Sequence, residues 1–159
     1  MSDRPRRPSV RLSPEEAWQA VSDAHTGIFT TLRRDGVPVS LPVWFVTLDH
    51  QVIMRTPATA KKVARVRTDP RSSFLVEAGL RWAELRAVHL TGRAEVVDDD
   101  GRLAEEIAPA WEAKYGGYTT ARTAMPDATR THYEVPFAYV RFTPDERIVS
   151  WDNRRLGLT

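Results

Sequence analysis

The sequence predicts a mostly β domain in which about seven antiparallel strands form a barrel, together with two or three helices. Apolar and polar residues alternate with a period of two in several short segments. Turn-forming residues separate neighbouring segments, so hairpins connect most of the strands. Such short connections favour an antiparallel barrel over a parallel sheet. The predicted strands are residues 27–32, 39–46, 51–56, 72–78, 87–97, 137–142 and 147–151.

A single domain is expected from a length of 159 residues. We assign it to residues 13–159, and residues 1–12, which are basic, to a flexible N-terminal arm. The arm has no apolar core of a secretory signal, and no segment approaches the roughly 20 apolar residues of a membrane helix. The chain has no cysteine, which excludes disulfides and thiolate metal sites. These features predict a cytoplasmic protein that does not bind a membrane.

The charge balance does not favour a nucleic-acid partner. The chain carries 23 basic and 21 acidic residues, which gives a formal net charge of only +2. Proteins that bind nucleic acids usually present a strong field of one sign. A local group of basic residues suits a small phosphorylated molecule better than a duplex.

The first helix is predicted by its capping signal. Ser13 stands at the N-cap position, Pro14 at the first helical position, and Glu16 completes a capping box. The first strand follows this helix, and a turn at Asp35-Gly36 leads into strand 39–46.

The central segment combines a hairpin with a short basic helix. Strand 39–46 carries apolar residues on both faces, and a turn at Asp49-His50 connects it to strand 51–56. Pro57 ends the second strand. Thr59 is then expected to cap a short helix that ends near Asp69-Pro70.

Four residues of this segment predict a phosphate site. Arg55 and Thr56 end a strand, and Lys61 and Lys62 lie at the start of the next helix. Helix N-termini carry unpaired donors and partial positive charge, arginine offers a planar fork for phosphate oxygens, and lysine offers a mobile charge. The alternative interpretation is that these basic residues form a solvated helix face.

The second half of the chain is less informative. Trp82 lies in the loop between strands 72–78 and 87–97, where it is expected to cover a nearby apolar face. A later helix carries an apolar stripe that predicts core packing, and residues 118–130 form an irregular loop near the mouth of the site. A final hairpin is expected, with its turn at residues 144–146. The stripe consists of Leu103, Ile107 and Trp111.

Common catalytic motifs are absent from the sequence. No dinucleotide, P-loop, nucleophile-elbow or zinc-protease motif occurs, and the four histidines are scattered singly. We therefore assign no catalytic side chain and no metal site. If such a protein is a catalyst, a bound cofactor would perform the chemistry, while the chain supplies position and electrostatics.

Several segments in this order resemble one family. They are PVWF, RT before the lysine-bearing helix, DPR, SSFLVEAG, GRAEVV and RIVSWD, and the resemblance covers roughly residues 26–152. The chain is similar to the pyridoxamine-phosphate-oxidase-like split β-barrel superfamily, and within it to the flavin and deazaflavin oxidoreductases that include F-420-dependent reductases.

The resemblance implies a homodimeric split barrel that transfers hydride between bound coenzyme F-420 and a small unsaturated or activated substrate. It implies ring contacts from Pro42, Val43 and Trp44 with Met54 beneath them, a phosphate held by Arg55, Thr56, Lys61 and Lys62, and stacking by Trp82 on the cofactor of the neighbouring subunit. The adjacent lysines favour F-420 because they also suit its acidic oligoglutamate tail. The alternatives are an FMN-dependent oxidoreductase or oxidase and a carrier that binds a flavin or tetrapyrrole without turnover.

Overall fold

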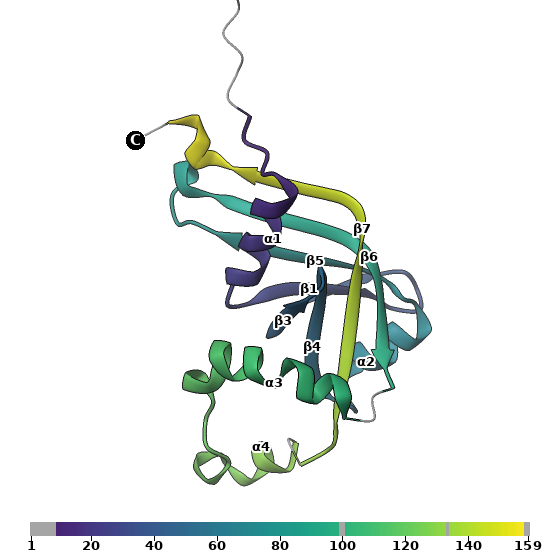
Figure 1. Ribbon diagram of the computed structural model, residues 1–159. Helices are drawn as coiled ribbons and strands as arrows, with labels where there is room; N and C mark the ends of the chain where they lie inside the picture. The colour runs from purple at the N-terminus through teal and green to yellow at the C-terminus, as the bar shows by residue number, and fades with distance from the viewer. Residues whose placement is uncertain (1–8, 99–100, 133, 158–159) are drawn as a thin grey trace, which may run out of the picture.

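The computed structural model describes residues 9–98, 101–132 and 134–157 as a curled antiparallel sheet with helices against it (Figure 1). The strand order is β2-β1-β5-β6-β7-β4-β3. This architecture confirms the predicted mostly β, antiparallel split barrel. The strands are β1 (Gly27–Leu32), β2 (Pro38–Val43), β3 (Phe45–Leu48), β4 (Gln51–Pro57), β5 (Arg71–Ala78), β6 (Arg86–Val97) and β7 (Phe137–Asp152).

The described residues contain four α-helices, where the sequence predicted two or three. The additional helix is the six-residue α4, which is too short to show a helical period. The α-helices are α1 (Pro14–Asp23), α2 (Lys61–Thr68), α3 (Arg102–Tyr115) and α4 (Asp127–His132). Four short 3-10 helices accompany them, namely η1 (Trp82–Glu84), η2 (Gly116–Tyr118), η3 (Arg122–Ala124) and η4 (Asn153–Leu156).

The strand predicted at residues 39–46 is two strands, separated at Trp44. β2 pairs with β1, whereas β3 pairs with β4, and these two halves form the opposite edges of the sheet. A single residue therefore joins the two edges, and the sheet must curl to bring them together. The alternation of side chains runs through the break, so the sequence pattern did not reveal it.

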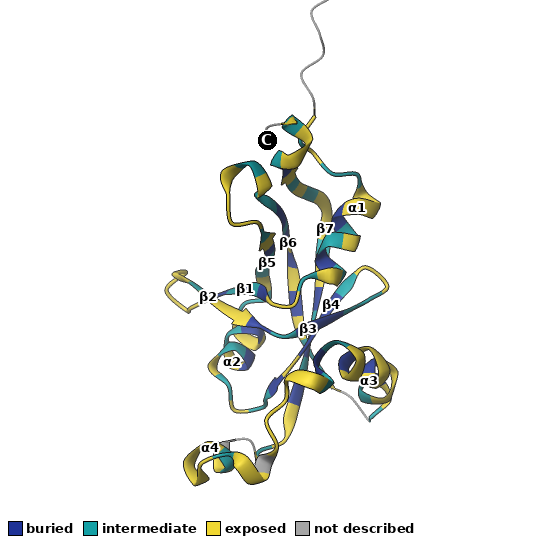
Figure 2. Cartoon of the chain, turned by 90° about the vertical axis from the view of Figure 1, so that its left-hand side faces the viewer, coloured by how far each residue is buried: buried dark blue, intermediate teal, exposed yellow. Residues whose placement is uncertain are grey.

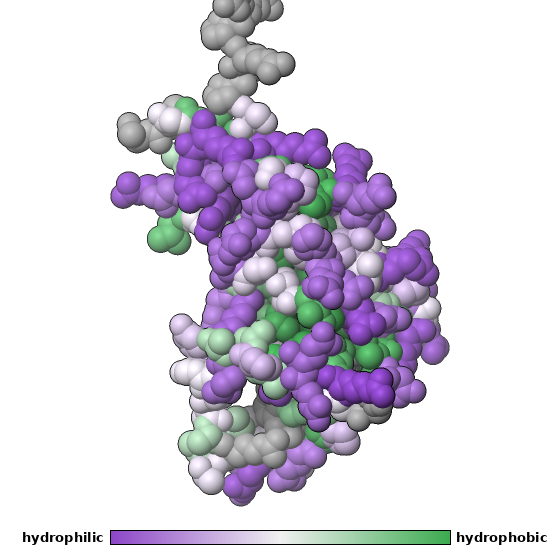
Figure 3. Space-filling model, in the orientation of Figure 1, coloured by the Kyte–Doolittle hydropathy of each residue, from purple (hydrophilic) through white to green (hydrophobic). Residues whose placement is uncertain are grey.

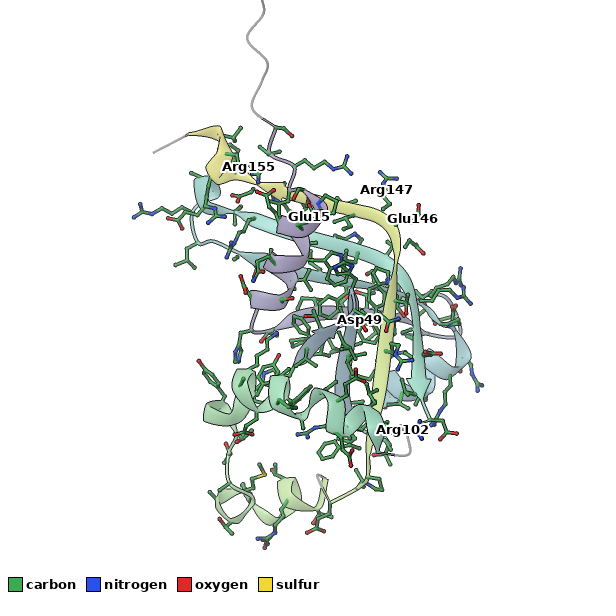
Figure 4. The ribbon with its side chains drawn as sticks, in the orientation of Figure 1. Glu15, Asp49, Arg102, Glu146, Arg147 and Arg155 are labelled. Atoms are coloured by element: carbon green, nitrogen blue, oxygen red, sulfur yellow. The ribbon has the colours of Figure 1, made fainter. Side chains whose placement is uncertain are left out.

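The final hairpin predicted for residues 137–151 is wrong, because β7 is one continuous strand. Leu90 pairs with Ile148 and Gly92 with Pro144, so residues 145–147 bulge opposite Thr91 alone. Pro144 has no N–H to donate, and β7 tolerates it at this irregularity without turning back. Figure 4 shows Glu146 and Arg147 at the resulting bend. The strand count remains seven because one predicted strand splits and two merge.

Gly92 allows the backbones of β6 and β7 to approach each other at this bulge. A Cβ atom added to Gly92 would lie 2.2 Å from the carbonyl oxygen of Thr143. No other residue fits this position without moving β7. The bend in the long strand is therefore encoded jointly by Pro144 and Gly92.

Two apolar clusters form the core, and Figure 2 shows their buried residues along the middle of the barrel strands. The barrel interior contains an aromatic group in which Phe45 and Phe74 meet at 4.8 Å between ring centroids. A second cluster lies between α3 and the outer face of β3 and β4, and it confirms the predicted apolar stripe. Its buried members are Val46, Ile53, Leu103, Ile107, Trp111 and Tyr115.

Hydrogen bonds fix the N-terminal segment at the start of α1 and just before it. The predicted capping box is confirmed, since the N–H of Ser13 donates to Glu16 at 2.8 Å and the N–H of Glu16 donates to the Ser13 hydroxyl at 3.2 Å. Before the helix, the carbonyl of Val10 accepts from the N–H of Asp152 at 2.7 Å. The predicted arm thus follows β7 over its described part, and its residues 1–8 lie outside the described residues.

No helix in the described part of the chain is long and apolar enough to cross a membrane. The cytoplasmic location and the limits of the single domain stay predictions.

The half-buried ammonium of Lys114 in α3 provides a test of the packing between α3 and α1. Its ammonium lies 3.8 Å from the centroid of the Phe45 ring and donates to the carbonyl of Ser22 at 3.2 Å. Burial lowers the pKa of Lys114 from 10.5 to about 8, although the negative charge of Asp23 opposes the shift. The folded protein therefore releases a proton that the unfolded chain still holds between these two values.

We predict that the free energy of unfolding of the wild type rises with pH from about 8 to 10.5 relative to that of Lys114→Met. Urea unfolding at several pH values measures this difference. Lys61→Met, which removes an exposed lysine, serves as the control and should retain the wild-type pH dependence. Parallel curves for wild type and Lys114→Met would show that Lys114 is not desolvated in the folded state.

Candidate functional site

A cavity of about 780 Å³ opens between the strand break at Trp44, the end of β4, and the segment from α3 to α4. In the space-filling view an opening remains between α3 and α4 (Figure 3). We call this space the basic cavity. Its lining residues are Pro42, Val43, Trp44, Met54, Arg55, Thr56, Pro57, Lys62, Trp111, Tyr118, Thr119, Thr120, Ala124, Met125, Pro126, Thr129 and Phe137.

Among the described residues, those that line the basic cavity include two cations and no carboxylate. Arg55 and Lys62 are its basic members, and none of the residues in the lining is aspartate or glutamate. Hydroxyl groups of threonines and a tyrosine add polar contacts. A cavity that presents cations without acidic partners favours an anionic ligand.

Two aromatic rings hold the guanidinium of Arg55. Its carbon Cζ lies 4.8 Å from the centroid of the Trp111 ring and 4.6 Å from that of the Phe137 ring. Within the described residues, no carboxylate forms an ion pair with Arg55. The side chain is therefore ordered by stacking, and its N–H donors stay available to a ligand.

Lys62 lies half-buried in the first turn of α2. Burial lowers the pKa of its ammonium, and the positive charge of Arg65 lowers it further. The N-cap of this helix is Ala60 and not the predicted Thr59, because α2 starts one residue later than a Thr59 cap requires. Ala60 has no side chain that could accept a hydrogen bond from the first turn of the helix. The ammonium of Lys62 and the uncapped N-terminus of α2 both give this end of the cavity positive charge.

The opposite wall of the cavity is aromatic and fixed by Tyr115. The Trp44 ring stacks on the Tyr115 ring at 4.4 Å between centroids, with 5° between their planes. The Tyr115 hydroxyl accepts from the N–H of Phe45 at 2.8 Å and lies within hydrogen-bond distance of two carbonyls, His25 at 2.9 Å and Phe45 at 2.8 Å. Burial raises the pKa of this hydroxyl to about 12, so it stays protonated.

Seven of the nine predicted cofactor-binding residues line the basic cavity. They are the two cations Arg55 and Lys62, the buried Met54 and Thr56, and the three residues at the strand break, Pro42, Val43 and Trp44. Lys61 is exposed on α2 and does not line the cavity. Trp82 lies outside it too, in η1 with 61% of its surface exposed. Cofactor binding by these residues stays a prediction.

The sequence did not reveal the outer part of the cavity. Trp111 belongs to the predicted core stripe, and the structure shows that the same ring also faces Arg55. The segment from Tyr118 to Thr129 has no periodic pattern, and it was expected only to lie near the mouth of a site. Phe137 begins β7 in a position that only the fold places beside Arg55.

The geometry suits a flat ring with a phosphate-bearing side chain. Trp44, Val43 and Pro42 offer apolar and aromatic surface at the strand break, while Arg55, Lys62 and the start of α2 offer positive charge. Among the described residues, no group of three or more histidine, aspartate or glutamate side chains is arranged to hold a metal ion.

Comparisons with known proteins agree with this geometry. The family model described as pyridoxamine 5'-phosphate oxidase matches residues 13–144. A conserved hypothetical protein from Mycobacterium tuberculosis is 30% identical in sequence, with a TM-score of 0.77, and the match covers 100% of this chain and 94% of that one. No curated protein matches the sequence.

Two more distant structures share the fold. An FAD-binding protein from Mesorhizobium loti is 20% identical, with a TM-score of 0.66 and coverage of 87% of this chain and 92% of that one. A heme storage protein from Vibrio cholerae is 14% identical, with a TM-score of 0.66 and coverage of 89% and 95%.

The position of Lys62 predicts how phosphate binding depends on pH. Because its pKa is lowered, Lys62 loses its proton at a lower pH than an ordinary lysine. The affinity for inorganic phosphate should therefore fall as the pH rises through the alkaline range, where the charge of the phosphate no longer changes. In Lys62→Arg this loss should be smaller, since arginine stays protonated. Calorimetric titration with inorganic phosphate at several pH values measures the affinities of the wild type and of Lys62→Arg. Identical pH profiles for the two proteins would place the phosphate away from Lys62.

Proposed function

Because the chain belongs to the pyridoxamine 5'-phosphate oxidase family, we propose that it is an oxidoreductase that binds a phosphorylated flavin or deazaflavin in the basic cavity. The observation that carries this proposal is the lining of the cavity, which joins two cations without acidic partners to an aromatic wall. When bound, the coenzyme would exchange hydride with a small unsaturated or activated substrate.

The chain's own residues would bind and orient the coenzyme. Arg55 and Lys62 would hold the phosphate, supported by the Thr56 hydroxyl and the start of α2. The backbone and side chains at Pro42 and Trp44 would contact one side of the ring system. No side chain is required to form a covalent bond, which agrees with the absence of a nucleophile–base pair among the residues that line the cavity.

F-420 is the coenzyme that we favour, because Lys61 extends the positive charge beyond Lys62 toward solvent, where an acidic tail would lie. FMN is the second candidate. The FAD-binding proteins from Mesorhizobium loti and Mycobacterium smegmatis, which share this fold at 20% identity, support a flavin in such a barrel. A carrier without turnover would also bind the coenzyme tightly, but the loaded protein would not transfer hydride from any reductant to any acceptor.

A homodimer belongs to the same proposal. Large apolar side chains are exposed together at the connection between β5 and β6 and at the end of β7. The amide of Asn153 donates to the carbonyl of Trp82 at 2.8 Å, which fixes η1 against η4 and holds these groups near one another. A second copy would cover them and bring Trp82 toward its partner's cavity. They are Leu80, Trp82, Val149 and Trp151, with 99%, 61%, 40% and 38% of their surface exposed.

The double variant Arg55→Ala/Lys62→Ala tests the phosphate site. Each charge-assisted contact contributes about 1.5–3 kcal/mol, so the dissociation constants of FMN and F-420 should both rise by about a hundredfold or more. Fluorescence titration measures these constants. The control Arg34→Ala/Arg67→Ala removes two exposed cations outside the basic cavity and should bind like the wild type. Unchanged affinity in the first variant would move the phosphate site elsewhere.

Sedimentation tests the dimer. The wild type should sediment as a dimer at micromolar concentration, and Trp82→Ala/Trp151→Ala should shift it toward monomer, because both changes remove exposed apolar area. Val37→Ala, which truncates an exposed apolar residue in the turn between β1 and β2, should leave the dimer intact. A monomeric wild type would contradict the proposed role of Trp82 in a partner's site.

A further inference from the structure

The outer wall of the basic cavity is a stretch of chain without an anchor in the core. It consists of residues 117–132, which follow α3 and end with α4, and we call it the outer segment. None of its side chains that the structure describes is buried, whereas Tyr115 before it and Ala138 beyond it are. Figures 1 and 2 both show α4 apart from the sheet, and Figure 2 shows this stretch as mostly exposed.

The hydrogen bonds of the outer segment are local. The Thr119 hydroxyl donates to the carbonyl of Gly116 at 3.2 Å, and the Thr131 hydroxyl donates to that of Asp127 at 3.0 Å. Within the part of the chain that the structure describes, no hydrogen bond joins this segment to a strand. Few interactions therefore oppose a movement of the segment as a unit.

Attachments to the barrel lie at the two ends of the outer segment. At its start the Tyr118 ring lies 4.6 Å from the imidazole of His25, measured between centroids. Beyond its end the carbonyl of Pro136 accepts from the N–H of Ala58 at 2.8 Å. Two glycines precede Tyr118, and a Cβ atom added to the second, Gly117, would meet nothing within 4 Å. Glycine adopts many backbone conformations, so this pair provides a hinge.

The inner face of the outer segment lines the basic cavity with neutral side chains. The Tyr118 ring is the largest of them, and 67% of its surface is exposed. A ligand between this face and the Trp44 ring would shield apolar surface on both from water. Apolar burial thus favours a closed segment when the cavity is occupied. The lining residues that the segment supplies are Tyr118, Thr119, Thr120, Ala124, Met125, Pro126 and Thr129.

We propose that the outer segment is a lid, which is open in the free protein and closes over a phosphorylated ring compound bound in the basic cavity. Arg55 and Lys62 hold the phosphate from β4 and α2, which do not move with the lid. The ring lies between Trp44 and the inner face of the lid. Closure removes water from the site, which strengthens the attraction between the cations and the phosphate. The lid rests on the proposed function, because its ligand is the coenzyme proposed there.

Distances between pairs of spin labels measure the movement of the lid. The chain has no cysteine, so introduced cysteines are labelled selectively. The lid pair is Ala64→Cys on the exposed face of α2 with Thr123→Cys in η3, and the control pair is Ala64→Cys with Ala113→Cys on the exposed face of α3.

The lid pair should give a broad distance distribution in the free protein and a narrower one, at shorter distance, when the ligand saturates the cavity. The control pair should give the same narrow distribution in both states, because α2 and α3 both pack on the barrel. A lid pair that is as narrow as the control pair in the free protein would overturn the proposal.

A lid that closes over its ligand also slows the release of that ligand. Tyr118→Ala/Met125→Ala removes the two largest side chains from the inner face, so the dissociation rate constant of the bound coenzyme should rise at least tenfold in stopped-flow measurements. Thr123→Ala changes a lid residue that does not line the cavity and should release the coenzyme like the wild type. An unchanged dissociation rate in the double variant would contradict the proposed closure.

Three phosphorylated ring compounds, FMN, F-420 and pyridoxine 5'-phosphate, separate the lid from the proposed function. If neither coenzyme binds while pyridoxine 5'-phosphate narrows the distribution of the lid pair, the coenzyme assignment fails and the lid stands. If a coenzyme binds and the distribution stays as in the free protein, the lid fails and the coenzyme assignment stands. Binding of none of the three compounds would overturn both.

Discussion

The hydroxyl of Tyr115 is the contact on which both the barrel and the basic cavity depend. At Trp44 the chain leaves one edge of the sheet and enters the other, and the N–H of Phe45, the first residue of β3, forms a hydrogen bond with α3. The buried hydroxyl accepts that hydrogen bond at 2.8 Å. A buried N–H without an acceptor would cost about 1–3 kcal/mol. The strand break is therefore stabilised from α3, an element about 70 residues away in the sequence.

The same tyrosine also determines the chemistry that the fold can hold. It stacks on Trp44 and fixes the carbonyl of His25, so the aromatic wall has one geometry. At the other end of the basic cavity, the cations are ordered without acidic partners, Arg55 by aromatic rings and Lys62 by partial burial. Charge and apolar surface are thus separated within one cavity, as a phosphorylated ring compound requires.

Local signals predicted the parts of the fold that depend on neighbouring residues. The capping box at Ser13, the turn at Asp49-His50, whose residues both have positive φ, and the cations at Arg55 and Lys62 were visible in the sequence. The break at Trp44 was not, because the alternation of side chains continues through it while the pairing partner changes. Pro144 predicted a turn, but the glycine that absorbs the irregularity lies on another strand.

The outer wall of the site was hidden for a similar reason. The Trp111 ring packs in the core and also contacts Arg55. Helical periodicity predicts only the first of these contacts. The residues from Tyr118 to Thr129 line the cavity by their place in space, without a pattern in the sequence. Side chains that act across elements are found only when the fold brings the elements together.

The central claim is that the basic cavity recognises the phosphate of a flavin or deazaflavin. A parallel fluorescence titration of the wild type with FMN, F-420 and riboflavin, which lacks the phosphate, tests it most directly. At least one phosphorylated coenzyme should bind, and riboflavin should bind about a hundredfold more weakly than FMN or worse, because it cannot engage Arg55 and Lys62. Equal affinity for riboflavin and FMN, or binding of none of the three, would contradict the account.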